Sequence, residues 1–210
     1  MKLVVLISGR GSNLQAILDA NLPAEIMAVL SNREDAPGLQ RARACGIPAH
    51  ALAHTDYAIR AEFDHAMMQL IDSYAPDLVV LAGYMRILTD EFVQHYAGRL
   101  INIHPSLLPS YPGLNTHSRA LADGVKVHGC TVHLVTPTLD HGPVIAQAAV
   151  AVHSDDNAAS LEARVLAAEH QLYPLAIRWF VENRLVLDDN GKVNLLNGER
   201  SEQSVFYTGA

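Results

Sequence analysis

Three polar side chains with complementary chemistry stand out in the second half of the chain. Asn102 and His104 lie near the end of an apolar run, residues 100–103, that is followed at once by Pro105. Residues two apart on a strand share a face, so this amide and this imidazole should project side by side. Asp140 follows in a loop between two extended apolar runs, and it is a candidate acid for the same site.

An amide, an imidazole and a carboxylate together suit acyl transfer. A non-ionising amide can donate to a developing oxyanion, and removing one such donor typically lowers a rate by ~10²–10³. A histidine exchanges protons near neutral pH, and a neighbouring carboxylate orients it and favours imidazolium. These groups predict a tetrahedral intermediate without a covalent enzyme nucleophile. Spacing alone leaves open that Asn102 is a strand-end turn residue and Asp140 a turn acid.

The elements that must position these groups follow an α/β pattern. Continuous apolar runs are typical of strands buried on both faces of a parallel sheet, and amphipathic segments separate them. Ligands in such sheets bind at the carboxyl ends of strands, where Asn102 and His104 are expected. The apolar runs occupy residues 2–8, 26–30, 47–52, 77–82 and 100–103.

The pattern changes toward the C-terminus. The runs 127–135 and 143–152 are joined by a moderate loop, which suits an antiparallel pair, and a long helix should start near Asn157. We therefore predict a single-domain α/β fold with a doubly wound, mostly parallel, Rossmann-like sheet that becomes mixed and is flanked by helices. The domain is assigned to residues 1–184. Residues 185–210 are assigned to a C-terminal tail, packed on it or forming a short hairpin.

A glycine-rich turn follows the first strand. The run Ser8-Gly-Arg-Gly-Ser-Asn13 precedes an amphipathic segment, so backbone N–H groups at a helix start could attract an anion. A P-loop would need Gly-Lys-Ser/Thr, and a dinucleotide fingerprint would need a third glycine where Leu14 stands. A single phosphate is therefore favoured. The alternative is a tight turn with an ordinary helix cap from Ser12 or Asn13.

Composition narrows the class of protein. The 210 residues are 50% hydrophobic and 18% charged, which is typical of a globular chain. A net charge of -7 argues against a broad nucleic-acid-binding face. No apolar run approaches the ~20 residues of a membrane span, and the first residues resemble a strand more than a signal peptide. We expect a cytoplasmic protein with small-molecule partners, and buried free thiols at Cys45 and Cys130.

Eleven histidines raise the question of a metal site. The chain has no His-Glu-x-x-His, no paired cysteines and no tight histidine cluster in sequence, so no metal is expected. A Gly-x-Ser-x-Gly elbow is also missing from the sequence, which argues against a serine hydrolase.

The runs that surround these residues resemble the phosphoribosylglycinamide formyltransferase family, folate-dependent enzymes of purine synthesis. The run Asn102–Pro109 (Asn-Ile-His-Pro-Ser-Leu-Leu-Pro) is typical of folate-dependent formyl transfer in general. The other matching runs lie in family order, at Ile7–Gln15, Ala82–Leu88, Tyr111–Leu114, Leu139-Asp140, Gly142–Ile145, Glu169-His170 and Tyr173-Pro174.

The resemblance implies a reaction and a set of catalytic residues. The formyl group of 10-formyltetrahydrofolate, a co-substrate, would pass to the amine of N1-(5-phospho-D-ribosyl)glycinamide in de novo purine (IMP) biosynthesis. Asn102, His104 and Asp140 would be the catalytic residues.

The resemblance also implies how the two substrates are held. Gly11, Ser12 and Asn13 would hold the ribose phosphate, and Glu169 would contact the same substrate. The folate would be held largely through backbone groups, by Arg60, Met85, Arg86, Ile87, Leu88, Asn102, Thr136, Pro137, Thr138, Leu139 and Asp140.

Three other functions are compatible with part of the sequence. Formyltetrahydrofolate deformylase shares the three catalytic residues but hydrolyses the formyl group, and it usually has an N-terminal regulatory domain, whereas a strand is expected here from residue 2. Methionyl-tRNA formyltransferase needs a C-terminal RNA-binding domain, for which the length and acidic balance leave no room. A catalytically idle folate- or phosphate-binding protein is the third. Either a monomer or a homodimer is compatible with the sequence.

Overall fold

The computed structural model describes residues 1–197 and 203–207. The chain divides into two compact units, which are described separately. Unit 1 comprises residues 1–102 and 135–137, and unit 2 comprises residues 103–134 and the chain from 138 onward.

Unit 1 is built on parallel strands in the order β3-β2-β1-β4-β5. In the middle of this order, Val5 on β1 pairs with Val29 on one side and Val80 on the other. This arrangement confirms the predicted parallel sheet. The strand bounds are β1 Lys2–Ile7, β2 Glu25–Ser31, β3 Ala49–Ala51, β4 Leu78–Leu81 and β5 Leu100–His104, the last of which continues into unit 2.

Helices cover both faces of this sheet. Val4 and Leu6 belong to a core with residues of α3 and α4, whereas Val5 and Ile7 point to the opposite face because side chains alternate along β1. On that opposite face, a Cβ added to Gly38 would lie 2.5 Å from Ile7 Cδ1, so the start of α2 is packed closely there. The helices of unit 1 are α1 Ser12–Asp19, α2 Gly38–Ala44, α3 Arg60–Asp72 and α4 Asp90–His95, with a 3₁₀ turn, η1, at His54–Asp56.

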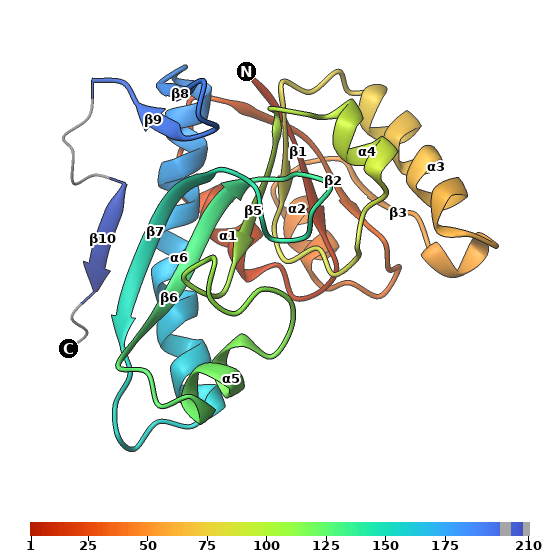
Figure 1. Ribbon diagram of the computed structural model, residues 1–210. Coiled ribbons are helices and arrows are strands. Elements are labelled where there is room, and N and C mark those ends of the chain that lie inside the picture. The colour runs from red at the N-terminus through yellow and green to blue at the C-terminus, as the bar shows by residue number, and fades with distance from the viewer. Residues whose placement is uncertain (198–202, 208–210) are drawn as a thin grey trace. The chain divides into compact units, whose positions relative to one another are not determined.

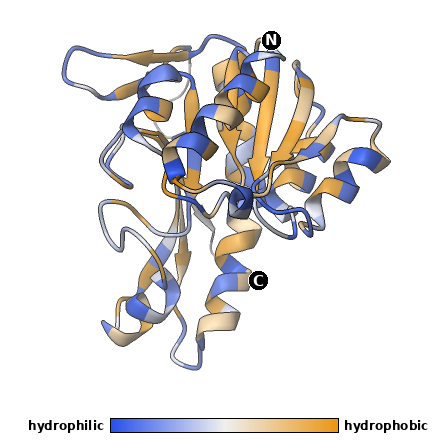
Figure 2. Ribbon diagram, turned by 90° about the vertical axis from the view of Figure 1, so that its right-hand side faces the viewer, coloured by the Kyte–Doolittle hydropathy of each residue, from blue (hydrophilic) through white to orange (hydrophobic). Residues whose placement is uncertain are grey.

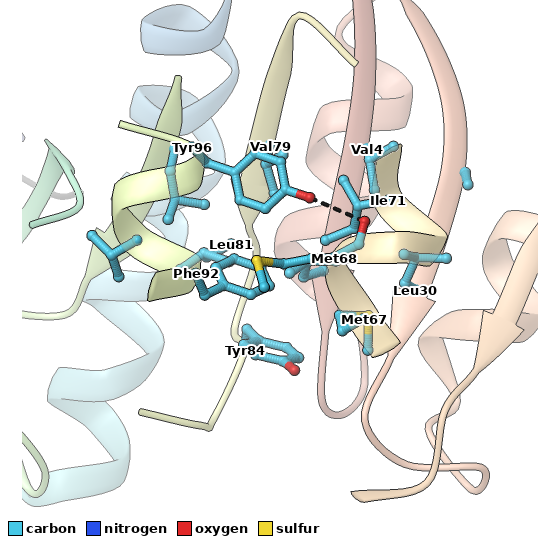
Figure 3. Packing of buried hydrophobic residues seen from close by; sticks show 14 of the residues in the cluster. Val4, Leu30, Met67, Met68, Ile71, Val79, Leu81, Tyr84, Phe92 and Tyr96 are labelled. Carbon is cyan, nitrogen blue, oxygen red and sulfur yellow. Dashed lines mark hydrogen bonds between the residues drawn. The ribbon is translucent and has the colours of Figure 1, made fainter. Parts of the chain in front are cut away.

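Figure 3 shows the core beneath α3 and α4. Met67, Met68 and Ile71 of α3 meet Phe92 of α4 and Tyr96, the residue after α4, over the apolar strand residues. The Tyr96 hydroxyl lies 3.3 Å from the Met68 carbonyl. It also lies 2.9 Å from Asp72 Oδ1, so the buried phenol has acceptors for its proton. Figure 2 shows the strands as mostly hydrophobic and the helices as two-sided, the pattern expected when a sheet is covered by amphipathic helices.

Unit 2 contains the antiparallel part of the fold. Strand β6, Val127–Leu134, pairs antiparallel with β7, Val144–Ala151, and β10, Ser204–Tyr207, pairs parallel with β7. The 24-residue helix α6, Ala158–Val181, packs against β6 and β7 (Figure 1). The predicted change to a mixed sheet is therefore confirmed. The remaining elements are α5 Thr116–Ala122 and an antiparallel hairpin of β8 Leu185–Leu187 and β9 Val193–Leu195.

Two local predictions differ from the structure, and a third agrees with it. Cys130 is a buried free thiol, but Cys45 is exposed, so the prediction of a buried Cys45 was wrong. The N-cap of α1 is Gly11, without a side-chain cap, because Ser12 already belongs to the helix. The predicted hairpin in the tail is present as β8 and β9. Residues 198–202 and 208–210 of that tail lie outside the described residues.

No helix within residues 1–197 or 203–207 is long and apolar enough to cross a membrane.

Candidate active site

His104 ends strand β5 as a buried side chain that is 6% exposed, and Asn102 lies two residues earlier on the same face. The Nε2 atom of His104 lies 3.0 Å from the Tyr111 carbonyl oxygen, and the Nδ1 atom of His104 lies 3.5 Å from Asp140 Oδ2. A carbonyl can only accept, and an ionised carboxylate can only accept. Both ring nitrogens therefore face acceptors.

The Tyr111 carbonyl is aimed by the loop that follows β5. Tyr111 has a left-handed φ of 56°, which turns its backbone toward the histidine. The buried Ser106 hydroxyl donates to the Ser110 carbonyl at 2.6 Å and lies 3.2 Å from the Tyr111 carbonyl. Thr131 of β6 in turn donates to the Ser106 carbonyl at 2.7 Å. The orientation of His104 thus depends on a loop anchored to the neighbouring part of unit 2.

Asp140 lies in the turn between β6 and β7, with a left-handed φ of 53°. Its side chain is only 8% exposed, and its Oδ2 atom accepts the Gly113 N–H at 2.8 Å. That hydrogen bond holds the carboxylate beside His104, at a distance that allows charge interaction but exceeds that of a good hydrogen bond. The structure therefore brings Asp140 to His104, which sequence spacing alone left open.

His133 is a further neighbour of Asp140 that the sequence analysis did not single out. Its Nε2 atom lies 4.0 Å from Asp140 Oδ1, and its Nδ1 atom lies 2.9 Å from the Leu134 carbonyl. Burial lowers the pKa of His133, and the Leu134 carbonyl and Asp140 oppose this only in part. Strand alternation on β6 could have placed His133 on the same face as Thr131, but not beside Asp140.

The glycine-rich turn of unit 1 is held tightly against α2. Gly11 has a left-handed φ of 71°, and a Cβ added there would lie 2.9 Å from Gly38 Cα. The Gly9 carbonyl accepts the Gly38 N–H at 3.0 Å, and the Arg10 carbonyl accepts Arg41 Nε at 2.9 Å. The turn leads directly into α1, whose first-turn N–H groups have no partners within the helix.

The other predicted contacts with phosphoribosylglycinamide differ in burial. In unit 1, Ser12 is half-buried, and Asn13 is buried at the start of α1. In unit 2, Glu169 lies on α6 and is 6% exposed. Burial raises the pKa of the Cys130 thiol, and the charge of Glu169 also raises it. The Glu169 carboxylate is therefore near enough to interact with this buried thiol in the interior of unit 2. A buried carboxylate on an apolar helix face is unfavourable unless it has partners.

Two loops contain the predicted folate contacts. In unit 1, Met85 and Ile87 lie two residues apart in a loop and are 68% and 58% exposed, which is unusual for large apolar side chains. Arg60 is exposed, and its Nη1 atom lies 3.5 Å from the Ile87 carbonyl, so it contacts the loop itself. In unit 2, Leu139 is 51% exposed beside Asp140. Four of the residues between β6 and β7 that were predicted to contact folate are half-buried or exposed, namely Thr136, Pro137, Thr138 and Leu139, whereas the side chain of Asp140 is only 8% exposed.

The described residues contain no group of three or more His, Cys, Asp or Glu side chains that could hold a metal ion.

A mostly parallel sheet with a buried imidazole–carboxylate pair defines an α/β protein equipped for acid–base chemistry. The chain belongs to the formyl transferase family, which it matches over residues 1–177. It is 52% identical over 204 residues to phosphoribosylglycinamide formyltransferase of Escherichia coli (strain K12), covering 95% of each chain. It is 48% identical over 193 residues to the enzyme of that name from Haemophilus influenzae, covering 90% of this chain and 91% of the relative.

Solved structures lead to the same family. The phosphoribosylglycinamide formyltransferase of Coxiella burnetii superimposes with a TM-score of 0.90 and 48% identity, over 99% of each chain. Glycinamide ribonucleotide transformylase 1 of Symbiobacterium toebii superimposes with a TM-score of 0.91 and 47% identity, over 94% of each chain. These likenesses confirm the predicted fold class and the family that the sequence motifs indicated.

Proposed function

We propose that this protein transfers the formyl group of 10-formyltetrahydrofolate to the amine of phosphoribosylglycinamide. The products are formylglycinamide ribonucleotide and tetrahydrofolate, a step of de novo purine biosynthesis. The identity to enzymes named for this reaction, over nearly the full length of both chains, supports the choice of substrates. The buried His104–Asp140 pair is the single structural observation that carries the chemistry.

The acceptor amine needs little activation. An α-amino group has a pKa of roughly 7.7–8.0, so a usable fraction is neutral at pH 7. The amine nitrogen attacks the formyl carbon, and the carbonyl electron pair moves onto oxygen to give a tetrahedral intermediate. The bond from carbon to the folate nitrogen then breaks, and that nitrogen gains the proton that the amine nitrogen loses.

Each of the three central residues has a role in this sequence. Asn102 donates its amide N–H to the developing oxyanion, and the doubly protonated ring of His104 supplies positive charge and a second donor. Asp140 stabilises the charged ring and assists proton movement from the amine to the folate nitrogen. Because Asp140 is only 8% exposed, its charge interaction with His104 is screened less by water than a surface pair would be.

The proposed substrate contacts are those that the family resemblance implies. The ribose phosphate binds at Gly11, Ser12 and Asn13, where the N–H groups of the first turn of α1 favour an anion. Glu169 contacts the glycinamide substrate. The folate is held by the segments at residues 85–88 and 136–140, whose exposed apolar members, Met85, Ile87 and Leu139, are available to its rings.

Hydrolysis of the same co-substrate is the rival activity. It would use the same three residues with water as the acceptor. The relatives of high coverage are named for transfer to phosphoribosylglycinamide, which favours transfer over deformylation.

An acceptor-competition assay tests the proposal. The protein is supplied with 10-formyltetrahydrofolate and one of three acceptors: phosphoribosylglycinamide, water alone or charged initiator tRNA. The formylated product is identified by mass spectrometry. Formylglycinamide ribonucleotide is expected at a rate far above formate release. Formate as the main product in the presence of the glycinamide would contradict the proposal, and so would formylated tRNA.

A further inference from the structure

The segment of residues 85–89, here called the 85–89 loop, lies in the connection between β4 and α4 in unit 1 and contains four of the proposed folate contacts. Two of its side chains, Met85 and Ile87, point largely into solvent, so they contribute little to fixing the backbone. Leu88 packs, partly buried, against the core of unit 1, and the order of the rest of the loop depends on its backbone hydrogen bonds. The hydrogen bonds at its two ends are therefore informative.

At its first residue, the 85–89 loop is held by the hydroxyl of Ser8. Ser8 is buried, 7% exposed, directly after β1. Its Oγ atom accepts the Met85 N–H at 2.8 Å and donates to Asn32 Oδ1 at 2.6 Å. A hydroxyl has one proton to donate, and Asn32 receives it, so the lone pairs remain for Met85. Ser8 also donates its backbone N–H to the Gly83 carbonyl at 3.1 Å.

At its last residue, the 85–89 loop is held by the carboxylate of Asp64 on α3. Asp64 is 1% exposed, and its Oδ2 atom accepts the Thr89 N–H at 2.7 Å. Its Oδ1 atom has no hydrogen-bond partner in the part of the chain that the structure describes. A buried carboxylate with one hydrogen bond is unfavourable for stability, so packing alone does not account for an acid here.

Asp64 belongs to a helix face that supports the middle of the loop as well. Arg60, Phe63 and Asp64 are neighbours on one side of α3, because residues three and four apart on a helix share a face. The Arg86 guanidinium lies 4.5 Å from the centroid of the Phe63 ring, and Arg60 reaches the Ile87 carbonyl at 3.5 Å. The loop is thus held at both ends by buried acceptors and between them by this face.

We propose that Asp64 and Ser8 are positioning residues for the folate co-substrate, which hold the 85–89 loop in its binding conformation before the ligand arrives. A loop that is already ordered loses less conformational freedom on binding, and this raises affinity without any direct contact. The inference rests on the proposed function, because it assumes that residues 85–88 contact folate. In this proposal Arg60 contacts the 85–89 loop as well as the folate.

Steady-state kinetics of Asp64 variants test the proposal. Asp64→Ala removes the acceptor for Thr89, whereas Asp64→Asn keeps an acceptor oxygen and removes the charge. For Asp64→Ala we expect KM for 10-formyltetrahydrofolate to rise roughly tenfold, with kcat within about twofold and KM for phosphoribosylglycinamide unchanged. Asp64→Asn should restore most of the lost affinity. Glu62→Ala, an exposed acid on the same helix, is the matched control and should leave both KM values unchanged.

Hydrogen exchange provides a readout that does not depend on turnover. The amides of Met85 and Thr89 should be protected in the unaltered protein. Ser8→Ala should accelerate exchange of the 85–89 loop and raise KM for the folate in the same direction, even if Asp64→Ala does not fold. The proposal is wrong if these variants raise both KM values together, or if loop exchange is unchanged. If the unaltered protein showed no formyl transfer, the proposed function would be contradicted. Hydrogen exchange would still test whether Asp64 and Ser8 hold the 85–89 loop.

Discussion

At the scale of single residues, the site depends on what each polar atom of His104 faces. One ring nitrogen is 3.0 Å from a backbone carbonyl, and the other is 3.5 Å from a carboxylate oxygen. A neutral ring could satisfy only one of these acceptors, because it has one N–H. The Tyr111 carbonyl can therefore take one ring N–H, and the Asp140 carboxylate lies beside the other ring nitrogen.

Replacing Asp140 tests this arrangement. Asp140→Asn keeps an oxygen that can accept the Gly113 N–H but removes the charge beside His104. We expect kcat to fall by roughly 10²–10⁴-fold, because acid–base groups in this role typically contribute that much. Thermal unfolding of the variant should be nearly unchanged. An exposed acid, Asp35→Asn, is the control for a general effect of charge, and near-normal turnover of Asp140→Asn would remove Asp140 from the mechanism.

At this scale, sequence and structure agree where strand periodicity alone determines which way a side chain points. The shared face of Asn102 and His104 follows from alternation on β5 alone. The approach of Asp140 to His104 depends on a left-handed turn residue and on the Gly113 N–H, which are tertiary features. For the same reason, no sequence pattern indicated that His133 lies 4.0 Å from Asp140.

At the scale of elements, the glycine turn before α1 is restricted by both conformation and space. Gly11 combines a φ of 71° with a would-be Cβ contact of 2.9 Å to Gly38 Cα. By contrast, a Cβ added to Gly9 would meet nothing within 4 Å. The two glycines therefore form a matched pair for mutation.

Gly11→Ala should distort the turn and the start of α1. We expect the free energy of unfolding to fall by roughly 1–3 kcal/mol, the usual range for a strained backbone conformation. We also expect KM for phosphoribosylglycinamide to rise at least severalfold, with a smaller change for the folate. Gly9→Ala should have little effect on either quantity. Chemical denaturation and steady-state kinetics measure both, and equal effects of the two substitutions would contradict this account of the turn.

Elements were predictable where hydrophobic periodicity was long. The strands of unit 1 and the antiparallel pair β6 and β7 follow from continuous apolar runs, and α6 from its apolar stripe and the Asn157 cap. Short elements were missed. Helix α5 has seven residues after an Asn115 with a left-handed φ of 57°, and β10 has four residues that pair only with the distant β7. Neither has enough local signal to exceed that of a loop.

At the scale of the whole molecule, buried histidines make stability depend on pH. Burial and the charges of His117 and His104 together lower the pKa of His128 to about 4, and a backbone hydrogen bond with Pro105 opposes them only in part. An unfolded histidine has a pKa of about 6.5. Between pH 6.5 and about 4 the unfolded chain therefore binds more protons than the folded one. By linkage, the free energy of unfolding decreases as pH falls through this range.

The measurement is chemical denaturation at a series of pH values from 7.5 to 4.5. We expect His128→Gln to decrease the loss of stability across this range, because the titrating group is gone. His65→Gln, at an exposed position on α3, is the control and should keep the original slope. The lowered pKa values of His117, His133 and His170 should leave part of the slope in the His128 variant. A slope identical to that of the unaltered protein would show that His128 does not contribute.

The central claim is direct transfer of the formyl group between two bound substrates. The most direct test is to follow a ¹³C label in the formyl carbon of 10-formyltetrahydrofolate in the presence of phosphoribosylglycinamide. The account predicts that the label appears in formylglycinamide ribonucleotide, in step with the tetrahydrofolate released. Labelled formate as the product, with the glycinamide amine left free, would contradict it.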